Sequence, residues 1–409
     1  MAHENDIEFC TWDEKHEKNL IKICTSLKMV NMLKNDKHKR ALEKLEKLID
    51  VNHIKEVEAK HQALWEGKAL SELPCIVAMP PQNDWPSYPF TECWDDIEKN
   101  FITLLGEVYA GALLKDDRLY SLEPNYGCVN IPELFGVESE VTNEGNSMSK
   151  GLNDVKKIQE IIECGIPDFD SSLNKKVEEF EEFALETLSQ YDTLRDTVHF
   201  NIPNIQGPFD LACLIWGRDI LFALYDEPDL VEKLMDLVTD TYIQYGLYHK
   251  KRLNLPVDSA YHCAGVKLVK GGVRICNDSA VLVSGDVYRN LIKSRDIKAF
   301  KPFDGGWIHF CGNGNHFLDE LFSLDLMHYL HMGNPDNHDL LKLSENAVEK
   351  NKVIVWSGSL EKIREARAIT GSSRILALPE NRYGGKNLND AKMRLKRVRN
   401  WQTIEKTEW

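Results

Sequence analysis

The sequence lacks both a long hydrophobic run and the N-terminal profile of an exported protein. Its longest apolar stretches, such as Leu211–Trp216, are far shorter than the ~20 residues that a helix needs to cross a bilayer. The first residues, Met1–Asp6, do not combine a basic start with an apolar stretch, as a signal peptide does. We therefore expect a cytoplasmic protein with no membrane partner, whose ten cysteines are reduced thiols.

Positive charge and the common catalytic motifs are also scarce. The 409 residues include 50 Lys and Arg against 65 Asp and Glu, which gives a net charge of −15. An acidic surface argues against broad nucleic-acid binding, which needs clustered positive charge. The sequence contains no Cys-x-x-Cys pair, P-loop, Gly-x-Ser-x-Gly elbow or His-Glu-x-x-His motif. With 43% hydrophobic and 28% charged residues, it has a globular composition. We expect an enzyme that acts on a small-molecule substrate.

Two regions with different patterns follow one another along the chain. Residues 1–70 are predicted to form an N-terminal helical extension, with one apolar face at Leu20, Ile23, Cys24, Leu27 and Val30 and another at Leu42, Leu45, Leu48 and Ile49. Residues 71–409 alternate short apolar runs with amphipathic helical stretches. The predicted strands are Cys75–Met79, Leu119–Leu122, Trp307–Cys311, Leu326–Met332, Val353–Ser357 and Arg374–Leu378.

The spacing of the last four runs indicates the fold class. Their starts lie roughly 20–25 residues apart, which is the rhythm of βα units with parallel strands. This α/β pattern fits a (β/α)8 TIM barrel or a doubly wound sheet. The barrel is favoured because no glycine-rich nucleotide-binding turn follows the first strand. We therefore predict a (β/α)8 barrel over residues 71–409, preceded by the helical extension.

The sharpest chemical signal is His309-Phe310-Cys311 at the end of a predicted strand. Residues two apart on a strand face the same way, so His309 and Cys311 would point together. Imidazole nitrogen and thiolate sulfur are ligands that Zn²⁺ prefers. The alternative is that both are ordinary strand residues without a metal. A third, thiolate ligand could come from Cys263, Cys276 or Cys128, and Glu380 could supply an oxygen ligand from the end of the last strand.

Other polar residues follow predicted strands and are candidates for catalysis. Asp278 comes after a strand that ends near Cys276, and it could orient a substrate or a ligating histidine. The alternative role for Asp278 is a helix cap. His199 and Asn201 end an earlier strand. In a barrel all three would lie at the carboxyl-end mouth, where active sites are found.

Several segments in order resemble the uroporphyrinogen decarboxylase superfamily over roughly residues 71–390. They are Glu123–Gly127, Leu134–Gly136, Gly207–Asp210, Ala223–Pro228, Ile275–Asp278, Ser284–Tyr288 and Ile308–Gly312. The resemblance implies a (β/α)8 barrel and one of two activities. One is the cofactor-free decarboxylation of haem synthesis. The other is zinc-dependent transfer of a methyl group between a corrinoid and a thiol.

The residues that differ from the family pattern favour the second activity. The arginine-rich motif of the decarboxylase is expected near Cys75–Tyr88, which contains no Arg or Lys. The methyltransferase branch uses a His-x-Cys pair plus a later cysteine, and His309 and Cys311 match the pair. Glu380 stands about where the third ligand is expected. The resemblance therefore implies zinc at His309, Cys311 and Glu380, and a corrinoid carried by the substrate or by a partner protein.

Two other interpretations stay open from the sequence. One is a decarboxylase that acts on a carboxylate or tetrapyrrole substrate, with basic groups from Arg218, Lys267 or Arg274. The other is a catalytically silent barrel that serves as a scaffold for a corrinoid protein or another partner. Members of the family are often dimers, so a homodimer is a further expectation.

Overall fold

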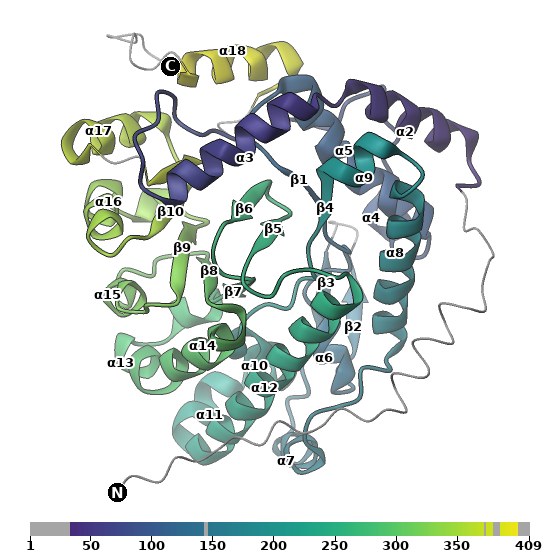
Figure 1. Cartoon of the computed structure of the whole chain (residues 1–409). Coiled ribbons are helices and arrows are strands. Elements are labelled where there is room, and N and C mark those ends of the chain that lie inside the picture. The colour runs from purple at the N-terminus through teal and green to yellow at the C-terminus, as the bar shows by residue number, and fades with distance from the viewer. Residues whose placement is uncertain (1–32, 143–145, 372–373, 379–384, 400–409) are drawn as a thin grey trace, which may run out of the picture.

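The computed structural model describes residues 33–142, 146–371, 374–378 and 385–399 (Figure 1). The α-helices are α2 (Asp36–Leu48), α3 (Val51–Trp65), α4 (Phe90–Cys93), α5 (Ile97–Leu114), α6 (Asn130–Leu134), α7 (Val155–Cys164), α8 (Ser172–Leu188), α9 (Asp192–Thr197), α10 (Pro208–Trp216), α11 (Ile220–Asp226), α12 (Pro228–Arg252), α13 (Gly285–Val287), α14 (Lys293–Phe300), α15 (Leu318–Phe322), α16 (Leu340–Glu349), α17 (Leu360–Thr370) and α18 (Leu388–Arg399). Shorter 3-10 or π turns are η1 (Ser279–Leu282), η2 (Tyr288–Ile292), η3 (Lys301–Phe303) and η4 (Pro335–Asn337).

The strands are β1 (Tyr120–Leu122), β2 (Ser139–Val141), β3 (Ser147–Ser149), β4 (Val198–Phe200), β5 (Ala260–His262), β6 (Val266–Leu268), β7 (Val273–Cys276), β8 (Gly306–Phe310), β9 (Met327–Met332), β10 (Val353–Trp356) and β11 (Ile375–Ala377). Five of them form a parallel sheet in the order β11-β10-β9-β8-β7, and β1 pairs in parallel with β4. β2 with β3 and β5 with β6 form antiparallel hairpins. The predicted α/β class with parallel strands is confirmed.

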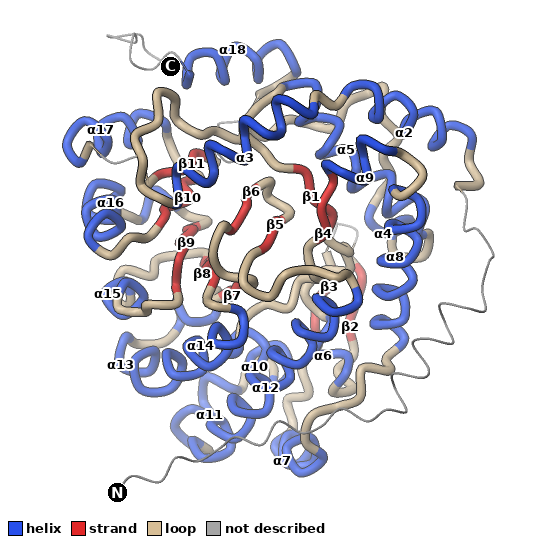
Figure 2. The backbone as a smooth tube through the Cα atoms, viewed as in Figure 1, coloured by secondary structure: helices blue, strands red, loops and turns tan. Residues whose placement is uncertain are grey.

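The parallel strands surround the β5–β6 hairpin, and helices lie outside them (Figure 2). Alternate residues of each strand face opposite ways. Ile308, Leu330, Ile354 and Ile375 pack outward in a large buried cluster with the helices. Trp307, Tyr329, Val355 and Leu376 pack inward against Val266 and Leu268 of the hairpin and Leu64 of α3. The inside of the ring is therefore a packed core at the level of these residues.

The predicted strand Cys75–Met79 pairs less than expected. Within the described part of the chain it makes one parallel bridge, between Cys75 and Ala377. The reason is that side chains take two of its backbone donors: Asp117 Oδ2 accepts the N–H of Cys75 at 2.9 Å, and Asp116 Oδ2 accepts the N–H of Val77 at 2.9 Å. A closed sheet of eight strands stays a prediction.

The helices before residue 70 pack closely on the rest of the molecule. Leu42 and Leu45 of α2 are buried in a cluster that includes Phe101 of α5. His61 Nε2 of α3 lies 2.9 Å from the carbonyl oxygen of Asp117. The predicted face from Leu20 to Val30 lies outside the described residues, and a domain boundary at residue 70 stays a prediction.

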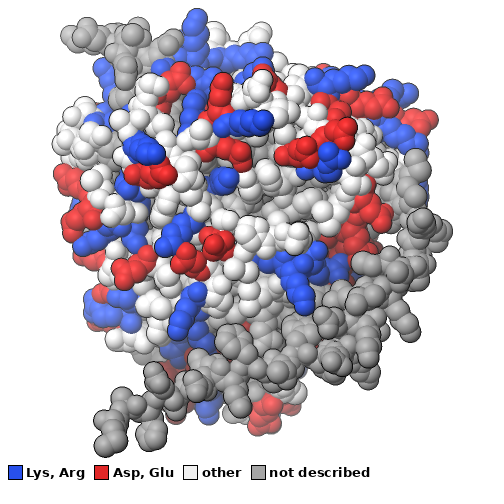
Figure 3. All heavy atoms as spheres, in the orientation of Figure 1, with Lys and Arg blue, Asp and Glu red and all other residues white. Residues whose placement is uncertain are grey.

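Charged side chains of both signs are interspersed over the face of the molecule seen in Figure 3. Among the helices that the structure describes, none combines the length and the apolar character needed to cross a bilayer.

Candidate functional site

His309 and Cys311 lie where the carboxyl end of β8 turns into a loop. Trp307 and His309 share the inner face of β8, and Phe310 packs outward with the helices. Cys311 follows the strand and is exposed. Gly312 then adopts φ +92, a conformation that L side chains rarely adopt and that turns the chain away from the sheet.

Asp278 joins these two residues from the end of the neighbouring strand, β7. Cys276 pairs with His309 in the register of β7 and β8, so residues just past Cys276 lie beside Cys311. Asp278 Oδ1 accepts the backbone N–H of Cys311 at 2.6 Å and lies 3.7 Å from His309 Nε2. Cys311 Sγ lies 3.6 Å from the same His309 nitrogen. Sequence analysis predicted His309 and Cys311 as ligands, and the structure adds Asp278 to this pair.

The three side chains have the chemistry and spacing of a zinc site. Their ligand atoms (one nitrogen, one sulfur and one oxygen) all lie within 4.8 Å of one another. Zinc bonds of ~2.0–2.3 Å in tetrahedral geometry place donor atoms roughly 3.3–3.6 Å apart. The separations of 3.6 Å and 3.7 Å from His309 Nε2 are close to this spacing. The residues fit zinc, and three protein ligands leave a fourth position for a substrate.

A second histidine contacts the ring of His309 on the side away from Cys311. His309 Nδ1 lies 2.9 Å from Nδ1 of His331, on β9, and His331 Nε2 is hydrogen-bonded to Ser357 Oγ. If His331 donates to Ser357, its Nδ1 accepts from His309 Nδ1–H, and His309 Nε2 keeps its lone pair toward Cys311 and Asp278. Burial, together with the charge of Arg274, lowers the pKa of His309 to about 3. His309 is therefore neutral at pH 7, as a metal ligand must be.

Two buried aspartates hold the turn that carries Asp278. Asp210, on α10, accepts the backbone N–H of Asp278 at 3.0 Å and that of Ser279 at 2.7 Å. Asp296, on α14, accepts from the side chain of Asn277 at 2.8 Å. Asp210 therefore holds the backbone at Asp278 and Ser279, and Asp296 holds the side chain of the preceding residue, Asn277.

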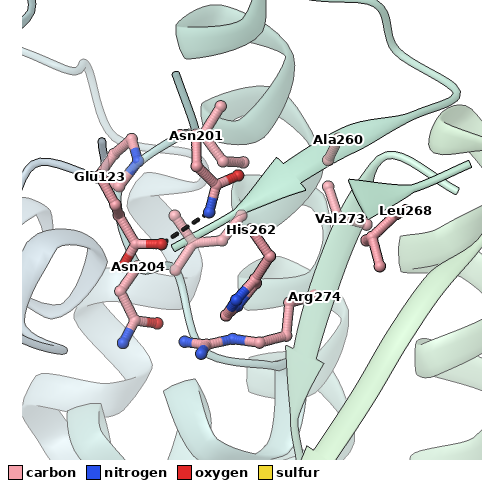
Figure 4. A pocket seen from close by; sticks show the side chains of 11 residues that line it. Glu123, Asn201, Asn204, Ala260, His262, Leu268, Val273 and Arg274 are labelled. Atoms are coloured by element: carbon pink, nitrogen blue, oxygen red, sulfur yellow. Dashed lines mark hydrogen bonds between the residues drawn. The ribbon is translucent and has the colours of Figure 1, made fainter. Parts of the chain in front are cut away.

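The other predicted site residues lie apart from this cluster. His199 stacks on Tyr261 with ring centroids 3.6 Å apart, and burial lowers the pKa of His199 to about 4. Asn201 donates to Glu123 Oε2 at 2.7 Å in a neighbouring pocket (Figure 4). The structure therefore brings Asp278, but not His199 or Asn201, together with His309 and Cys311. Glu380 lies outside the described residues, so its role stays a prediction.

The three cysteines considered as a third ligand, Cys128, Cys263 and Cys276, lie in three different surroundings. Cys276 is buried beside His309 in the sheet, and burial raises the pKa of its thiol to about 12. Cys128 contacts the carbonyl oxygen of Ser147 at 3.7 Å. Cys263 belongs to a second group of ligand-type residues, with Glu123 and His262. None of the three is in the described cluster around His309.

Sequence analysis missed His331, Glu123 and His262. His331 could have been found as a candidate, because it is the residue before the last in the predicted strand Leu326–Met332, which follows the strand of His309 in the βα order. Glu123 is in one of the segments that carry the family resemblance, Glu123–Gly127. Its place in the pocket and its contact with Asn201 depend on the fold and are not visible in the sequence. His262 lies on a hairpin of two three-residue strands, too short to give a clear periodic signal.

Comparisons with known proteins identify the fold and no family. No protein-family model matches the sequence, and no curated protein matches it either. A solved structure, described as a methyltransferase from Methanosarcina mazei, is similar with a TM-score of 0.58 and 17% sequence identity. The match covers 85% of this chain and 99% of that chain. At this identity, the similarity shows a shared fold.

Proposed function

We propose that this chain is a zinc-dependent enzyme that transfers a methyl group from a methyl-corrinoid to a thiol, on a (β/α)8 barrel. The observation that carries the proposal is the cluster of Asp278, His309 and Cys311 at the carboxyl ends of two parallel strands. The fold shared with a methyltransferase supports the same class of reaction. The nature of the corrinoid carrier and the identity of the thiol are parts of the proposal that depend on the sequence resemblance.

His309, Cys311 and Asp278 would hold the metal. Bound zinc would lower the pKa of an incoming thiol and keep it as a thiolate at neutral pH. With His309 Nδ1–H donated to His331, the lone pair of His309 Nε2 would be directed at the metal. Asp278 has a second role, because it holds the backbone of Cys311 in place through the 2.6 Å hydrogen bond.

The reaction needs no other reagent. The thiolate sulfur attacks the methyl carbon, a sulfur–carbon bond forms, and the cobalt–carbon bond breaks with its electron pair left on cobalt. The products are a methyl thioether and a Co(I) corrinoid. The thiol proton leaves to solvent before the attack.

The decarboxylase interpretation has less support from the positions of its basic residues. Arg218 is exposed, and Lys267 lies 3.3 Å from Glu58 Oε1 in an ion pair. Arg274 alone among the three lines a described pocket. A substrate with many carboxylates needs more basic groups than one.

Metal content and methyl transfer together test the proposal. Protein purified anaerobically without chelators is analysed for zinc beside Cys311→Ser, with Cys164→Ser, an exposed cysteine on α7, as the matched control. We expect near-stoichiometric zinc in the wild type and the control, and little in Cys311→Ser. Methylcobalamin and a small thiol should then give a methyl thioether and Co(I) absorbance with the same two proteins. Zinc-free wild-type protein would overturn the proposal.

A further inference from the structure

The loop that carries Cys311 is held from the strand ends on both sides of it. Phe310, the last residue of β8, still belongs to the sheet, because its carbonyl oxygen accepts the N–H of the residue after β9 at 2.9 Å. The next two backbone N–H groups, of Cys311 and Gly312, leave the sheet where the chain turns. Asp278 Oδ1 accepts the first at 2.6 Å, and Asn334 Oδ1 accepts the second, also at 2.6 Å.

These two hydrogen bonds fix the conformation of Cys311 itself. Its own N–H lies in the peptide plane before its Cα, and the N–H of Gly312 lies in the plane after it. Because each peptide unit is planar, two held planes leave little freedom to the φ and ψ of the residue between them. The direction of the Cα–Cβ bond of Cys311, and with it the reach of its sulfur, is therefore set by side-chain oxygens that follow two different strands.

The Cys311 thiol needs such support because it lies in an exposed loop. Its sulfur is 3.6 Å from His309 Nε2, at the edge of the proposed zinc cluster. Where a loop is exposed, water competes for the backbone N–H groups. A hydrogen-bond acceptor keeps the loop in one place only if the acceptor is itself fixed.

Asn334 is fixed by the chain that follows it. The next residue, Pro335, is buried, and a proline disfavours helical backbone in the residue before it. Asn334 has φ −118 and ψ 71, outside the helical region. Farther along the same two loops, Asn315 Nδ2 donates to the carbonyl oxygen of Asn337 at 2.9 Å, and the buried His338 ring contacts Asn315 Oδ1 at 2.9 Å. The loop after β9 therefore supports the Cys311 loop over several residues.

We infer that Asn334 is a positioning residue for Cys311, and that it keeps the thiol beside His309 by holding the N–H of Gly312. Asp278 holds only the peptide plane before Cys311, and its carboxylate is also one of the proposed metal ligands. The Asn334 amide is uncharged, so it holds the plane after Cys311 without being drawn to the metal. The inference rests on the proposed function for its effect on metal binding, whereas its effect on the loop needs no metal.

Four variants separate the hydrogen bond from the rest of the side chain. Asn334→Leu and the smaller Asn334→Ala remove the acceptor, and Asn334→Asp keeps an oxygen in the same place. Asn337→Leu is the matched control, because Asn337 is exposed in the same loop and its side chain makes no hydrogen bond to the residues that the structure describes. Circular dichroism and thermal unfolding check that every variant is folded.

The first measurement uses metal-free protein, isotope-labelled at the backbone nitrogen of its cysteines. NMR measures how fast each cysteine N–H exchanges with water, and Cys311→Ser identifies the Cys311 signal by its loss. The reporter is the Cys311 N–H, which is donated to Asp278 and not to Asn334. A local role for Asn334 would release Gly312 alone and leave this reporter unchanged.

We expect Asn334→Leu and Asn334→Ala to speed the exchange of the Cys311 N–H by about 3- to 10-fold, the range of one hydrogen bond. Asn334→Asp and Asn337→Leu should exchange at the wild-type rate. The N–H of Cys164, on α7, is the internal reference and should not change in any variant.

The second measurement replaces zinc by cobalt(II), whose absorbance reports the bound sulfur directly. A sulfur-to-cobalt charge-transfer band appears only when a thiolate is bound. We expect the band in the wild type and in Asn337→Leu at the same cobalt concentration. Asn334→Leu should need about 3- to 10-fold more cobalt for half-saturation. Asn334→Asp should bind cobalt at least as tightly as the wild type, because it restores the acceptor and adds a negative charge.

The two measurements fail in different ways. If the wild type binds neither zinc nor cobalt, the proposed function is overturned, and the exchange of the Cys311 N–H alone decides the inference. Unchanged exchange in both Asn334→Leu and Asn334→Ala overturns the inference, whatever the metal does. Faster exchange that Asn334→Asp does not restore also overturns it, because the oxygen is then not what holds the loop. Faster exchange with unchanged cobalt binding overturns it too, because the thiol then does not depend on the plane that Asn334 holds.

Discussion

At the scale of single residues, the zinc affinity that we propose for His309 would depend on a neighbour that is not itself in the cluster. His331 lies 2.9 Å from His309 Nδ1 and connects it to Ser357. Loss of this partner frees the His309 ring to rotate and to take the other tautomer. We predict that His331→Ala weakens zinc binding by about 10- to 100-fold, the usual cost of losing such an outer partner.

Competition with a chromophoric chelator measures this affinity directly. His316→Ala is the matched control, because His316 is exposed and is no part of the cluster. His331→Gln offers an amide that can partly replace the lost hydrogen bond. The zinc affinity of His331→Gln should therefore fall between that of the wild type and that of His331→Ala. Unchanged zinc affinity in His331→Ala would contradict the role of His331.

Gly333 lies beside the thiol of Cys311, and the position of that thiol requires a residue without a side chain there. A Cβ added at Gly333 would lie 2.6 Å from Cys311 Sγ and 3.4 Å from His309 Cε1. The first distance is too short, so the thiol must move. We predict that Gly333→Ala lowers the zinc content of the purified protein at least severalfold while the fold is retained, as elemental analysis and circular dichroism will show.

Gly106→Ala is the control for this substitution. Gly106 lies on α5, and its added Cβ would meet Trp85 at 3.3 Å, far from the ligand cluster. Zinc content in this variant should equal that of the wild type. A normal zinc content in Gly333→Ala would mean that the thiol of Cys311 is not needed where the structure places it.

At the scale of elements, the turn between β7 and η1 is held from α10 by Asp210. Burial raises the pKa of Asp210 to about 7, against the opposing hydrogen bond from Ser279 N–H, whereas its ordinary value is 3.8. Between pH 4 and pH 7 the native state then keeps a proton that the unfolded state has lost. The free energy of unfolding therefore falls as the pH rises through this range.

Asp210→Asn removes the titrating group. We predict that the stability difference between wild type and Asp210→Asn changes by up to about 4 kcal/mol from pH 4 to pH 7, since one pKa unit corresponds to about 1.4 kcal/mol. Urea denaturation at several pH values measures this difference. The loss of one hydrogen-bond acceptor lowers the free energy of unfolding of Asp210→Asn by the same amount at every pH. It therefore does not change the slope of that free energy against pH, which is what the comparison uses. Parallel pH profiles would contradict the prediction.

The elements that sequence could predict are those with a strong repeating pattern. The runs at Trp307–Cys311 and Leu326–Met332 correspond to β8 and β9 within one residue at each end. The β5–β6 hairpin gave no such signal, because each of its strands has three residues. Its place inside the ring depends on packing of Val266 and Leu268 against side chains from distant strands. Periodicity carries no information about such contacts.

At the scale of the whole molecule, the candidate site depends on how neighbouring strands are aligned. The His-x-Cys spacing predicted that His309 and Cys311 point together, since both lie on one strand and its continuation. The addition of Asp278 and His331 needed the register of β7 and β9 against β8. A single sequence indicates the order of the strands, which is enough to make Asp278 and His331 candidates, but it does not give the register that brings their side chains to His309.

Zinc at this site would connect segments from two strands, and its binding should therefore stabilise the whole molecule. Binding to the native state alone adds about 2.7 kcal/mol when free zinc is 100 times the dissociation constant. We predict that zinc raises the midpoint of thermal unfolding by a few degrees, that a chelator reverses the rise, and that Cys164→Ser behaves like the wild type. Cys311→Ser should show no rise.

Differential scanning calorimetry measures the zinc-dependent rise in these three proteins. A fourth protein, Cys263→Ser, tests whether the zinc binds at the other group of ligand-type residues. Glu123, His262 and Cys263 form the other described group with ligand-type atoms within 4.8 Å of one another. Arg274 influences both Glu123 and Cys263, and its positive charge disfavours a cation there. Cys263→Ser should therefore keep the full zinc-dependent rise. A rise that survives in Cys311→Ser and disappears in Cys263→Ser would move the metal to the second group and overturn its placement at His309.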